Sequence, residues 1–455
     1  MRSEFLNEML GALRDAERGS DASLREIGTG ELPSYFDVTG LATAAFGAAG
    51  LEVARLSCAA GEPPPEIQVD RRLASHWFGW SLRPQGWEMP SAWDDLAGDY
   101  EAVDGWIRLH TNVPAHRLAA LSVLGGARDR GAVEAEVSKW VAEDLESAVV
   151  GAGGCAAAMR SLEQWRAHPQ GVAVAQTPLV VWSPPHSCAA DRTVVDAARP
   201  LAEIRVLDLT RILAGPVGSR FLAAYGAEIL RIDPPDWDEP GVIPEVTLGK
   251  RCAGLDLRDR ADRSTFEDLL TSADVLLHGY RADALAGLGY DDETLRALNP
   301  ALIDVSLNAY GWAGEWKNRR GFDSLVQMSC GIAEHGMTQS GVGRPRPLPV
   351  QALDHATGYL LAAAVVSGLA RRNQGEVRSA RLSLARVAHL LGATKGSSHG
   401  PDFAPASEDE LDPRIENSDW GPAKRVRWPL KIRGVEARWD HPASQLRSVP
   451  PAWST

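Results

Sequence analysis

Asp354 is an acidic residue whose neighbours would leave its carboxylate accessible to a substrate. It stands in the stretch ALDHATG (352–358), at the start of a long Ala-rich segment. An aspartate can act as a covalent nucleophile, and small residues together with Gly358 would let a substrate approach the backbone closely. Aspartate is also a favoured helix N-cap, so a purely structural role is the alternative. The two roles are compatible because a helix N-terminus stabilises a carboxylate.

The elements that would position Asp354 alternate between strands and helices from residue 203 onward. Strands are expected near 203–209, 227–232, 274–277 and 301–307, and helices near 216–225, 261–272, 291–298 and 356–371. Such alternation predicts an α/β fold with a parallel sheet and right-handed crossovers. Pro216 would suit the first position of its helix, and one strand is expected around 424–433.

The first half of the chain lacks this alternation and is expected to be mainly helical. Helices are expected at 4–18, 38–57, 70–79, 115–124, 131–140, 141–150 and 160–167, with one strand at 105–111. The segment 36–56 also resembles 353–372, and each is followed by a short helix, at 72–79 and 386–392. Ala-rich helices often look alike by chance, but the shared downstream helix favours a real duplication.

Composition narrows the class of protein. The chain has 455 residues and a net charge of −13, which argues against nucleic acid or an anionic membrane as the default partner. The five cysteines show no metal-binding spacing, so reduced thiols and no metal site are expected. The N-terminus lacks the features of a signal peptide, and the apolar run at 359–370 is too short to span a bilayer. A cytoplasmic location is therefore expected.

Six motifs in the second half of the chain resemble the family III CoA-transferases, of the CaiB/BaiF type. In family order they are VLDLTRILAGP (206–216), YGAEILRIDPP (225–235), LGKRCAGLDLR (248–258), the segment 272–314, RRGFDSLVQMSCG (319–331) and LPVQALDHATG (348–358). Each motif alone is weak evidence. Six in order, at suitable spacing, are strong evidence for the resemblance.

The resemblance implies a Rossmann-like large domain and a smaller α+β domain. Residues 101–175 resemble the family's small domain, which here precedes the large domain instead of following it. The chain therefore resembles a permuted member, or a fused pair that has lost its first half. The expected divisions are a helical segment at 1–80 belonging with the large domain, a small domain at 81–182, a linker at 183–202, the large domain at 203–392 and a loop-rich segment at 393–455.

The activity implied by the resemblance is transfer of CoA from an acyl-CoA to a free carboxylic acid. Asp354 would be the catalytic nucleophile, passing through a mixed anhydride and an enzyme-bound thioester. Coenzyme A or acyl-CoA would enter as a substrate, and no permanently bound cofactor is expected. The family also implies a homodimer, which can be interlocked.

Nine positions carry over from the family as CoA-binding residues. They are Leu213, Ala214, Leu255, Arg258, Gly279, Tyr280, Arg281, Gly287 and Arg320. Arg258 keeps the positive charge of a lysine found in the family, whereas Gly287 replaces an arginine found in some members. An exposed surface role is the alternative for each arginine taken singly.

Two other functions stay open. Racemases of this fold have a His–Asp pair where this chain has Phe322 and Asp323. Phe322 cannot move a proton, which favours the transferase over an acyl-CoA racemase or lyase. The unusual domain order and Gly287 also leave room for a CoA-binding subunit without catalytic activity.

Overall fold

A seven-stranded sheet forms the centre of the molecule. In the computed structural model, which describes residues 3–14, 23–58, 62–188, 196–394 and 403–454, the strands run in the order β11-β10-β9-β12-β13-β15-β7. Their bounds are Lys250–Gly254 (β11), Glu228–Asp233 (β10), Arg205–Leu209 (β9), Val275–His278 (β12), Ile303–Asn308 (β13), Ala380–Ser383 (β15) and Val181–Trp182 (β7). Every pairing is parallel except that of β7 with β15. The predicted α/β fold with a parallel sheet is therefore confirmed.

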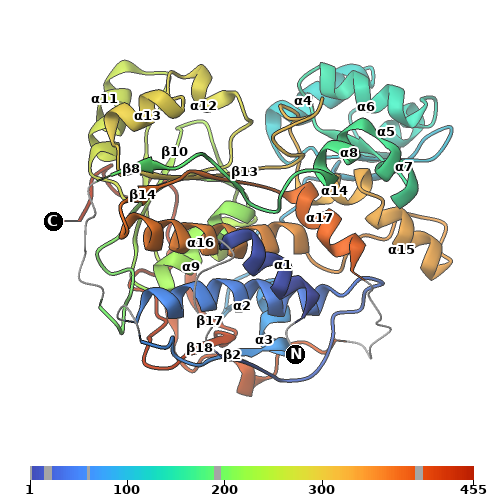
Figure 1. Cartoon of the computed structure of the whole chain (residues 1–455). Helices are drawn as coiled ribbons and strands as arrows, with labels where there is room; N and C mark the ends of the chain where they lie inside the picture. The colour runs from blue at the N-terminus through green and yellow to red at the C-terminus, as the bar shows by residue number, and fades with distance from the viewer. Residues whose placement is uncertain (1–2, 15–22, 59–61, 189–195, 395–402, 455) are drawn as a thin grey trace.

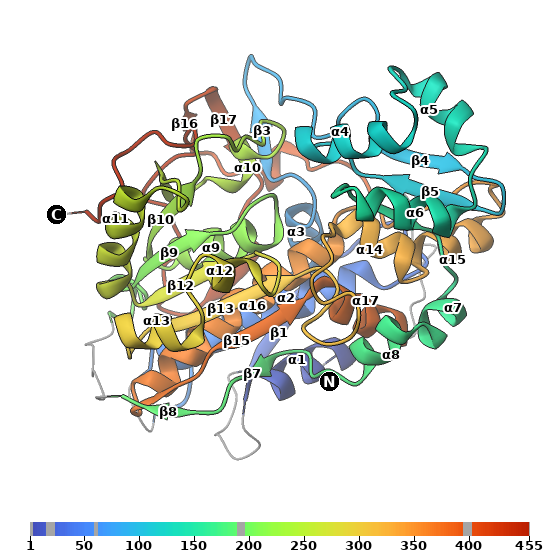
Figure 2. The ribbon, with the colours of Figure 1, turned by 90° about the horizontal axis from the view of Figure 1, so that it is seen from above.

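Helices cover both faces of this sheet (Figures 1 and 2). One face packs against α11 (Arg260–Thr271), α12 (Ala284–Gly287) and α13 (Asp292–Leu298). The other packs against α9 (Ala214–Ala224) and α16 (Ala352–Arg372), which is covered in turn by α2 (Val38–Leu56) and α1 (Glu4–Leu13). Because α16 lies between the sheet and α2, it is buried on all sides, which its many Ala and Gly residues permit.

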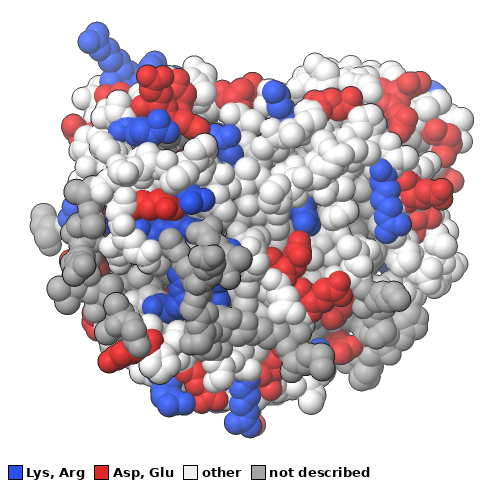
Figure 3. Space-filling model, in the orientation of Figure 1, with Lys and Arg blue, Asp and Glu red and all other residues white. Residues whose placement is uncertain are grey.

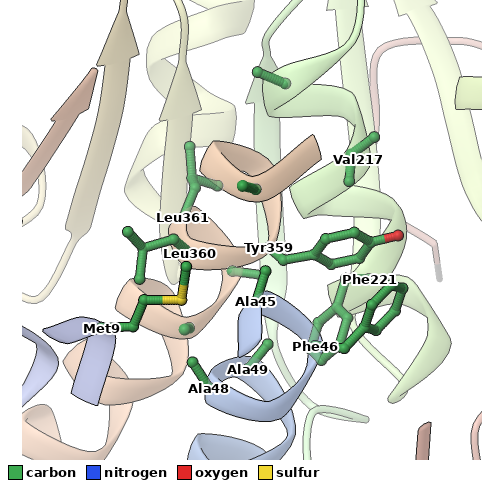
Figure 4. Close-up of a cluster of buried hydrophobic side chains, with 14 of the residues drawn as sticks. Met9, Ala45, Phe46, Ala48, Ala49, Val217, Phe221, Tyr359, Leu360 and Leu361 are labelled. Atoms are coloured by element: carbon green, nitrogen blue, oxygen red, sulfur yellow. The ribbon is translucent and has the colours of Figure 1, made fainter. Parts of the chain in front are cut away.

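The similar segments of the two halves lie side by side in this core. Helix α2 packs directly against α16, and Phe46 of α2 meets Tyr359 of α16 with ring centroids 4.0 Å apart. Figure 4 shows both rings beside Phe221 of α9, with Met9 of α1 close to α16. The resemblance between the two Ala-rich segments thus corresponds to a shared place in one hydrophobic core.

Gly358 lets two helices of the core approach closely. A Cβ built on Gly358 would lie 2.3 Å from the backbone oxygen of Ala214, at the start of α9. A Cβ on Gly218 would in turn lie 2.7 Å from the backbone oxygen of Gly358. The space beside Gly358 is therefore filled by α9, which gives this glycine a packing role in place of the substrate contact expected from the sequence.

A small three-stranded sheet lies to one side of the large one, and Figure 2 shows two of its strands, β4 (Gly98–Glu101) and β5 (Trp106–Leu109), in the upper right. The third strand is β6 (Ala156–Ala158), and the strands of this sheet are antiparallel. Around it lie α4 (Pro114–Val123), α5 (Arg130–Val137) and α6 (Ala142–Gly151). The next helices, α7 (Leu162–Ala167) and α8 (Pro169–Ala175), pack against each other and belong with the large hydrophobic core. β6 contacts α14 (Asp323–Ser329), so this unit reaches the segment that contains Phe322 and Asp323.

The remaining elements join the two ends of the chain. Sheet β1-β2-β18 combines Leu24–Ile27, Ile67–Asp70 and Leu430–Ile432, and sheet β16-β17-β3 combines Glu416–Ser418, Gly421–Arg425 and Leu82–Pro84. β8 (His186–Ser187) pairs with β14 (Glu376–Val377), and the other helices are α3 (Arg71–Trp77), α10 (Ile243–Val246), α15 (Ile332–Ser340) and α17 (Leu384–Ala393), with a 3-10 turn at Glu408–Glu410. The expected domain boundaries stay predictions, and residues 189–195 of the expected linker lie outside the described part.

Several local predictions need correction. The strand expected at 424–433 is two strands, β17 and β18, which belong to different sheets. Pro216 is the third residue of α9 and not the first. Strands β11 and β15 were not expected. The first helix ends at Leu13, and residues 15–18 of its expected range lie outside the described part.

Helix α16 is longer than its apolar run suggested. By length and composition it could cross a membrane, the one described helix of which this is true, but its whole apolar stretch is buried inside the structure. The central helix of a large hydrophobic core is buried in the same way. On the face seen in Figure 3, acidic and basic side chains are interspersed, so they form no single basic patch there.

Candidate active site

Asp354 lies in the first turn of α16. The helix begins at Ala352 with Gln351 as N-cap, and no side chain caps it. Asp354 is thus the third helical residue, and the structural alternative of an N-cap aspartate is wrong. The residue is 8% exposed, and no described residue hydrogen-bonds its carboxylate. The carboxylate is left available to a ligand, at a helix end that favours negative charge.

Two cavities meet at Asp354. One has a volume of about 340 Å³ and the other about 490 Å³. Both are lined by Asp354, Ile212, Leu213 and Phe322. A molecule that occupied both would therefore pass the Asp354 carboxylate at the junction.

The smaller cavity, here called the arginine cavity, lies at the carboxyl ends of β9, β12 and β13. Four arginines line it: Arg211, Arg281, Arg319 and Arg320. Ala214 and Gly215, in the first turn of α9, also line it, and helix N-termini bind anions through free backbone N–H groups. The carboxyl edge of an open parallel sheet is a common place for ligands. The cavity has the charge and the position expected of a phosphate-binding site.

Two of these arginines are held by neighbours. The guanidinium of Arg211 lies over the rings of Trp237 and Tyr280, 4.5 and 5.4 Å from their centroids. Arg319 pairs with Glu146 at 2.8 Å and lies 4.0 Å from the centroid of Trp316. Arg211 is therefore oriented by stacking and keeps its charge available, whereas Arg319 mainly joins the small sheet to this loop.

The larger cavity, here called the aromatic cavity, is built from distant parts of the chain. Phe78 and Trp80 follow α3, Trp93 and His110 flank the small sheet, and Phe322 precedes α14. The rings of His110 and Phe322 stack, with centroids 3.8 Å apart and planes 7° apart. The small sheet thereby closes one side of the space next to Asp354.

Asp323 is hydrogen-bonded to Asp354 and influences its ionisation. Its Oδ2 accepts a hydrogen bond of 2.9 Å from the backbone N–H of Asp354, and its Oδ1 accepts one from the side chain of Gln327. Burial raises the pKa of Asp323 to about 6. Burial, reinforced by the nearby Asp323 charge, also raises the pKa of Asp354 well above its usual range. The two carboxyl groups resist carrying two negative charges together.

The histidines of the site are neutral. Burial lowers the pKa of His355 and of His110 to about 3 in each case. The ring of His355 stacks on Phe78 at a centroid distance of 5.3 Å, so it packs behind Asp354. Neither side chain is suited to accept a proton near neutral pH.

Ile212 adopts a strained conformation between the cavities. Its φ is +64°, in the left-handed region that β-branched residues avoid. Its backbone N–H donates to Glu239 at 2.8 Å, and Glu239 pairs with the buried Arg231. The surrounding ion pair holds the strain in place, which is typical of backbone near a functional site.

Most of the residues expected from the sequence come together. Asp354, Leu213, Ala214, Gly279, Tyr280, Arg281 and Arg320 all line the arginine cavity. Three others do not: Leu255 is buried in the hydrophobic core, Arg258 is exposed and paired with Asp256 and Asp236, and Gly287 is exposed at the end of α12. CoA binding by these three stays a prediction.

Sequence reasoning missed other residues of the site. Arg211 lies inside the motif VLDLTRILAGP and could have been noted as a cation beside the first turn. Phe78, Trp93 and His110 carry no local signal, because only the tertiary fold brings them to Asp354. Among the described residues, no group of three or more His, Cys, Asp or Glu side chains could hold a metal ion.

The fold and the site define an α/β protein with a buried carboxylate at the carboxyl edge of its sheet. Residues 201–425 match the model of CoA-transferase family III, and this part of the chain belongs to that family. The matched residues include six of the seven strands of the central sheet, all but β7, and also Asp354 and the residues at the junction of the two cavities.

Individual proteins similar to this chain are the following. An "Acyl-CoA transferase" of Gibberella moniliformis is 30% identical over 299 residues, covering 60% of this chain and 52% of the relative. A "Succinate--glutarate CoA-transferase" of Agrobacterium fabrum is 31% identical, covering 37% of this chain and 47% of the relative. The chain thus spans about half the length of these curated relatives. A crystal structure of a hypothetical protein from Mycobacterium tuberculosis is 31% identical with a TM-score of 0.40, covering 43% of this chain and 58% of that one.

Proposed function

We propose that this protein is a CoA-transferase that moves CoA from an acyl-CoA to a free carboxylic acid, with Asp354 as the nucleophile. The observation that carries the proposal is the place of Asp354, at the junction between a cavity lined by four arginines and a second cavity beside it. The phosphates of CoA would lie in the arginine cavity and the acyl group in the aromatic cavity. The thioester between them would then face the carboxylate.

In the proposed chemistry, the carboxylate oxygen of Asp354 attacks the thioester carbonyl, and the C–S bond breaks to release CoA thiolate. The thiolate attacks the aspartyl carbonyl of the mixed anhydride, which frees the first acid and leaves an aspartyl-CoA thioester. The acceptor carboxylate then repeats the two steps in reverse and regenerates Asp354. Thioester energy is conserved, so the sequence needs no ATP.

The names of relatives support the same reaction class. One relative is named for CoA transfer between succinate and glutarate, and another as an acyl-CoA transferase. CoA as a substrate without a permanently bound cofactor, a homodimer and a cytoplasmic location are the further parts of the proposal that come from the sequence. The permuted order of domains likewise stays a prediction.

The racemase alternative lacks an acid/base partner for Asp354. Phe322 stands where a histidine would be needed, and His110, which stacks on it, has a pKa lowered to about 3 by burial. Exchange of the α-hydrogen for deuterium, in the absence of an acceptor acid, would favour that alternative.

Hydroxylamine trapping tests the proposal. Incubation with acyl-CoA and hydroxylamine should place a hydroxamate on the peptide that contains Asp354, and the Asp354→Ala variant should lose both the label and the transfer, by on the order of 10³-fold or more. Asp37→Asn is the matched control, since Asp37 precedes the similar helix α2 but lines neither cavity. Unchanged transfer in Asp354→Ala would exclude the mechanism. If CoA binds but transfer requires a second chain, the protein is a CoA-binding subunit.

A further inference from the structure

The two cavities at Asp354 differ sharply in charge. The arginine cavity has four cationic side chains. Among the described residues that line the aromatic cavity, none is Lys or Arg, and five are acidic: Asp94, Asp238, Glu239, Asp323 and Asp354. The step from one cavity to the other is thus a step from surroundings rich in arginine to surroundings that offer acidic side chains and no cationic one.

Three arginines that contact the wall of the aromatic cavity are held by other partners. Arg83 does not line the cavity and donates to the backbone oxygens of Trp80 and Leu82. Arg117 pairs with Asp94, and Arg108 pairs with Asp99 at 2.6 Å while its guanidinium lies 5.0 Å from the ring centroid of Trp93. Neither arginine lines the cavity itself. Arg117 therefore offsets Asp94 of the wall, and Arg108 offsets Asp99 outside it.

The histidines do not supply a positive charge either. His110 and His355 line the cavity, but both are buried against aromatic rings, at Phe322 and Phe78. Burial lowers the pKa of each to about 3, so both are neutral near pH 7. Acidic side chains without a bound arginine remain, namely Asp238, which is exposed, and the Asp323–Asp354 pair.

A second carboxylate on the acyl group would have no cation to meet in this cavity. It would instead lose water and approach acidic side chains, which is unfavourable for a buried charge. An uncharged body, in contrast, would contact Phe78, Trp80, Trp93 and Phe322, whose rings offer a large apolar surface.

We infer that the aromatic cavity selects acyl groups of monocarboxylic acids with an uncharged body, and discriminates against dicarboxylic acids. The inference rests on the proposed function, since it takes the aromatic cavity as the acyl side of the same site. It narrows the substrate class of that site by charge, which the reaction class alone leaves open.

A pair of nearly isosteric ligands tests this selectivity. Glutaryl-CoA and 4-carbamoylbutyryl-CoA have the same length and differ only in a terminal carboxylate against a carboxamide. Titration calorimetry on the full chain, with CoA alone as the reference, should show that the carboxamide binds at least about tenfold more tightly. The same titration in the Asp354→Ala variant, which cannot form the enzyme-bound thioester, separates binding from the first half of the reaction.

A variant that adds a positive charge to the aromatic cavity gives a second test of the selectivity. Trp80 lines the cavity and is 38% exposed, so an arginine can replace it at the rim. Trp80→Arg should reduce the preference for the carboxamide several-fold, whereas Trp80→Gln, which adds no charge, should keep it. A preference that is the same in both variants would overturn the assignment of this cavity to the acyl group.

The outcomes separate the inference from the proposed function. Equal binding of the two ligands by the unaltered protein, or tighter binding of glutaryl-CoA, overturns the selectivity but leaves the CoA-transferase proposal intact if CoA binds and Asp354 is trapped. If CoA and both acyl-CoAs fail to bind, the proposed function fails and the inference fails with it.

Discussion

The backbone N–H of Asp354 donates a hydrogen bond of 2.9 Å to Oδ2 of Asp323, which ties the first turn of α16 to the start of α14. The contact keeps two buried carboxyl groups close together. Burial raises the pKa of both, and the Asp323 charge raises the pKa of Asp354 further. Since only an ionised Asp354 is a nucleophile, the pair links the proposed chemistry to pH.

We therefore expect the rate of CoA transfer to rise with pH. Below the raised pKa of Asp354 the carboxyl group is protonated and inactive, and the ionised fraction grows as the pH passes through that pKa. Asp323→Asn removes the neighbouring negative charge, so the pKa of Asp354 should fall and the rise should move to lower pH. The measurement is kcat/KM for acyl-CoA across pH, in the two proteins.

Asp37→Asn serves as the control for that shift. Asp37 caps α2 through the backbone N–H of Gly40, and asparagine is an equally good cap. Its pH profile should match that of the unaltered protein. A profile of Asp323→Asn that also stays unchanged would mean that Asp323 does not set the ionisation of Asp354.

The arginine cavity makes a prediction about CoA affinity. Arg211→Met should weaken CoA binding by about tenfold or more, because a charged hydrogen bond to phosphate contributes about 1.5–3 kcal/mol. The long side chain of Met keeps part of the packing on Trp237 and Tyr280. Titration calorimetry with CoA, at two salt concentrations, measures the loss.

Arg258→Met is the informative companion. Arg258 belongs to the positions expected from the sequence, but its guanidinium is exposed and paired with Asp256 and Asp236. We expect little change in CoA affinity. A loss at Arg258 with none at Arg211 would place the phosphates outside the arginine cavity.

The close approach of α9 and α16 predicts a strict requirement at one glycine. In Gly358→Ala, the new Cβ would lie 2.3 Å from the backbone oxygen of Ala214, so α9 or α16 has to move. Overpacking of this kind costs about 1–3 kcal/mol. Because Ala214 begins the helix whose N-terminus lines the arginine cavity, CoA affinity should fall as well.

Gly392→Ala in α17 is the matched control for a helical glycine. The nearest atom to a Cβ there is Cδ2 of Leu162, at 3.8 Å, which is an ordinary contact. Stability should stay the same or rise, since alanine is the better helix former. Chemical denaturation measures both variants, and equal stability of Gly358→Ala and the unaltered protein would show that the helices separate easily.

Local periodicity was enough to predict the frame of the fold. The apolar runs around β9, β10, β12 and β13 alternate with helical segments, so the parallel sheet could be predicted from the sequence. Strand β11 was missed because it begins with Lys250 and Arg251. Lys250 is buried there beside Asp208, with Nζ and Oδ2 3.2 Å apart, and nothing in the sequence pairs residues so far apart.

The candidate site likewise has residues that the sequence could predict and residues that it could not. Asp354 and the first-turn residues Leu213 and Ala214 lie in motifs that a resemblance can locate. The aromatic cavity depends on His110 and Phe78, which reach Asp354 only when the small sheet and α3 pack against the large sheet. A motif could therefore locate the nucleophile, but the surroundings that set its ionisation and its ligand are a tertiary property.

A buried network around Glu245 predicts how strongly the chain ends contribute to stability. Glu245 is fully buried and pairs with Arg220 of α9 and with Arg425 of β17, while Ser81 Oγ donates to it at 2.6 Å. The network thus joins the segment near β3, the large sheet's helix layer and the C-terminal strand. In Glu245→Gln the buried Arg220 would lose its carboxylate partner, whereas Arg425 keeps its pair with Glu416. A buried charge left without a partner costs roughly 3–5 kcal/mol.

Glu66→Gln, which removes one partner of an exposed ion pair, is the control for Glu245→Gln. Glu66 pairs with Arg433 at 2.8 Å, but the side chains are 45% and 74% exposed, so water screens the pair and its loss should cost about 0–1 kcal/mol. The free energy of unfolding from denaturant titration measures both variants. If Glu245→Gln were no less stable than Glu66→Gln, the attachment of β17 would not depend on this network and would rest on its pairing with β3 and β16.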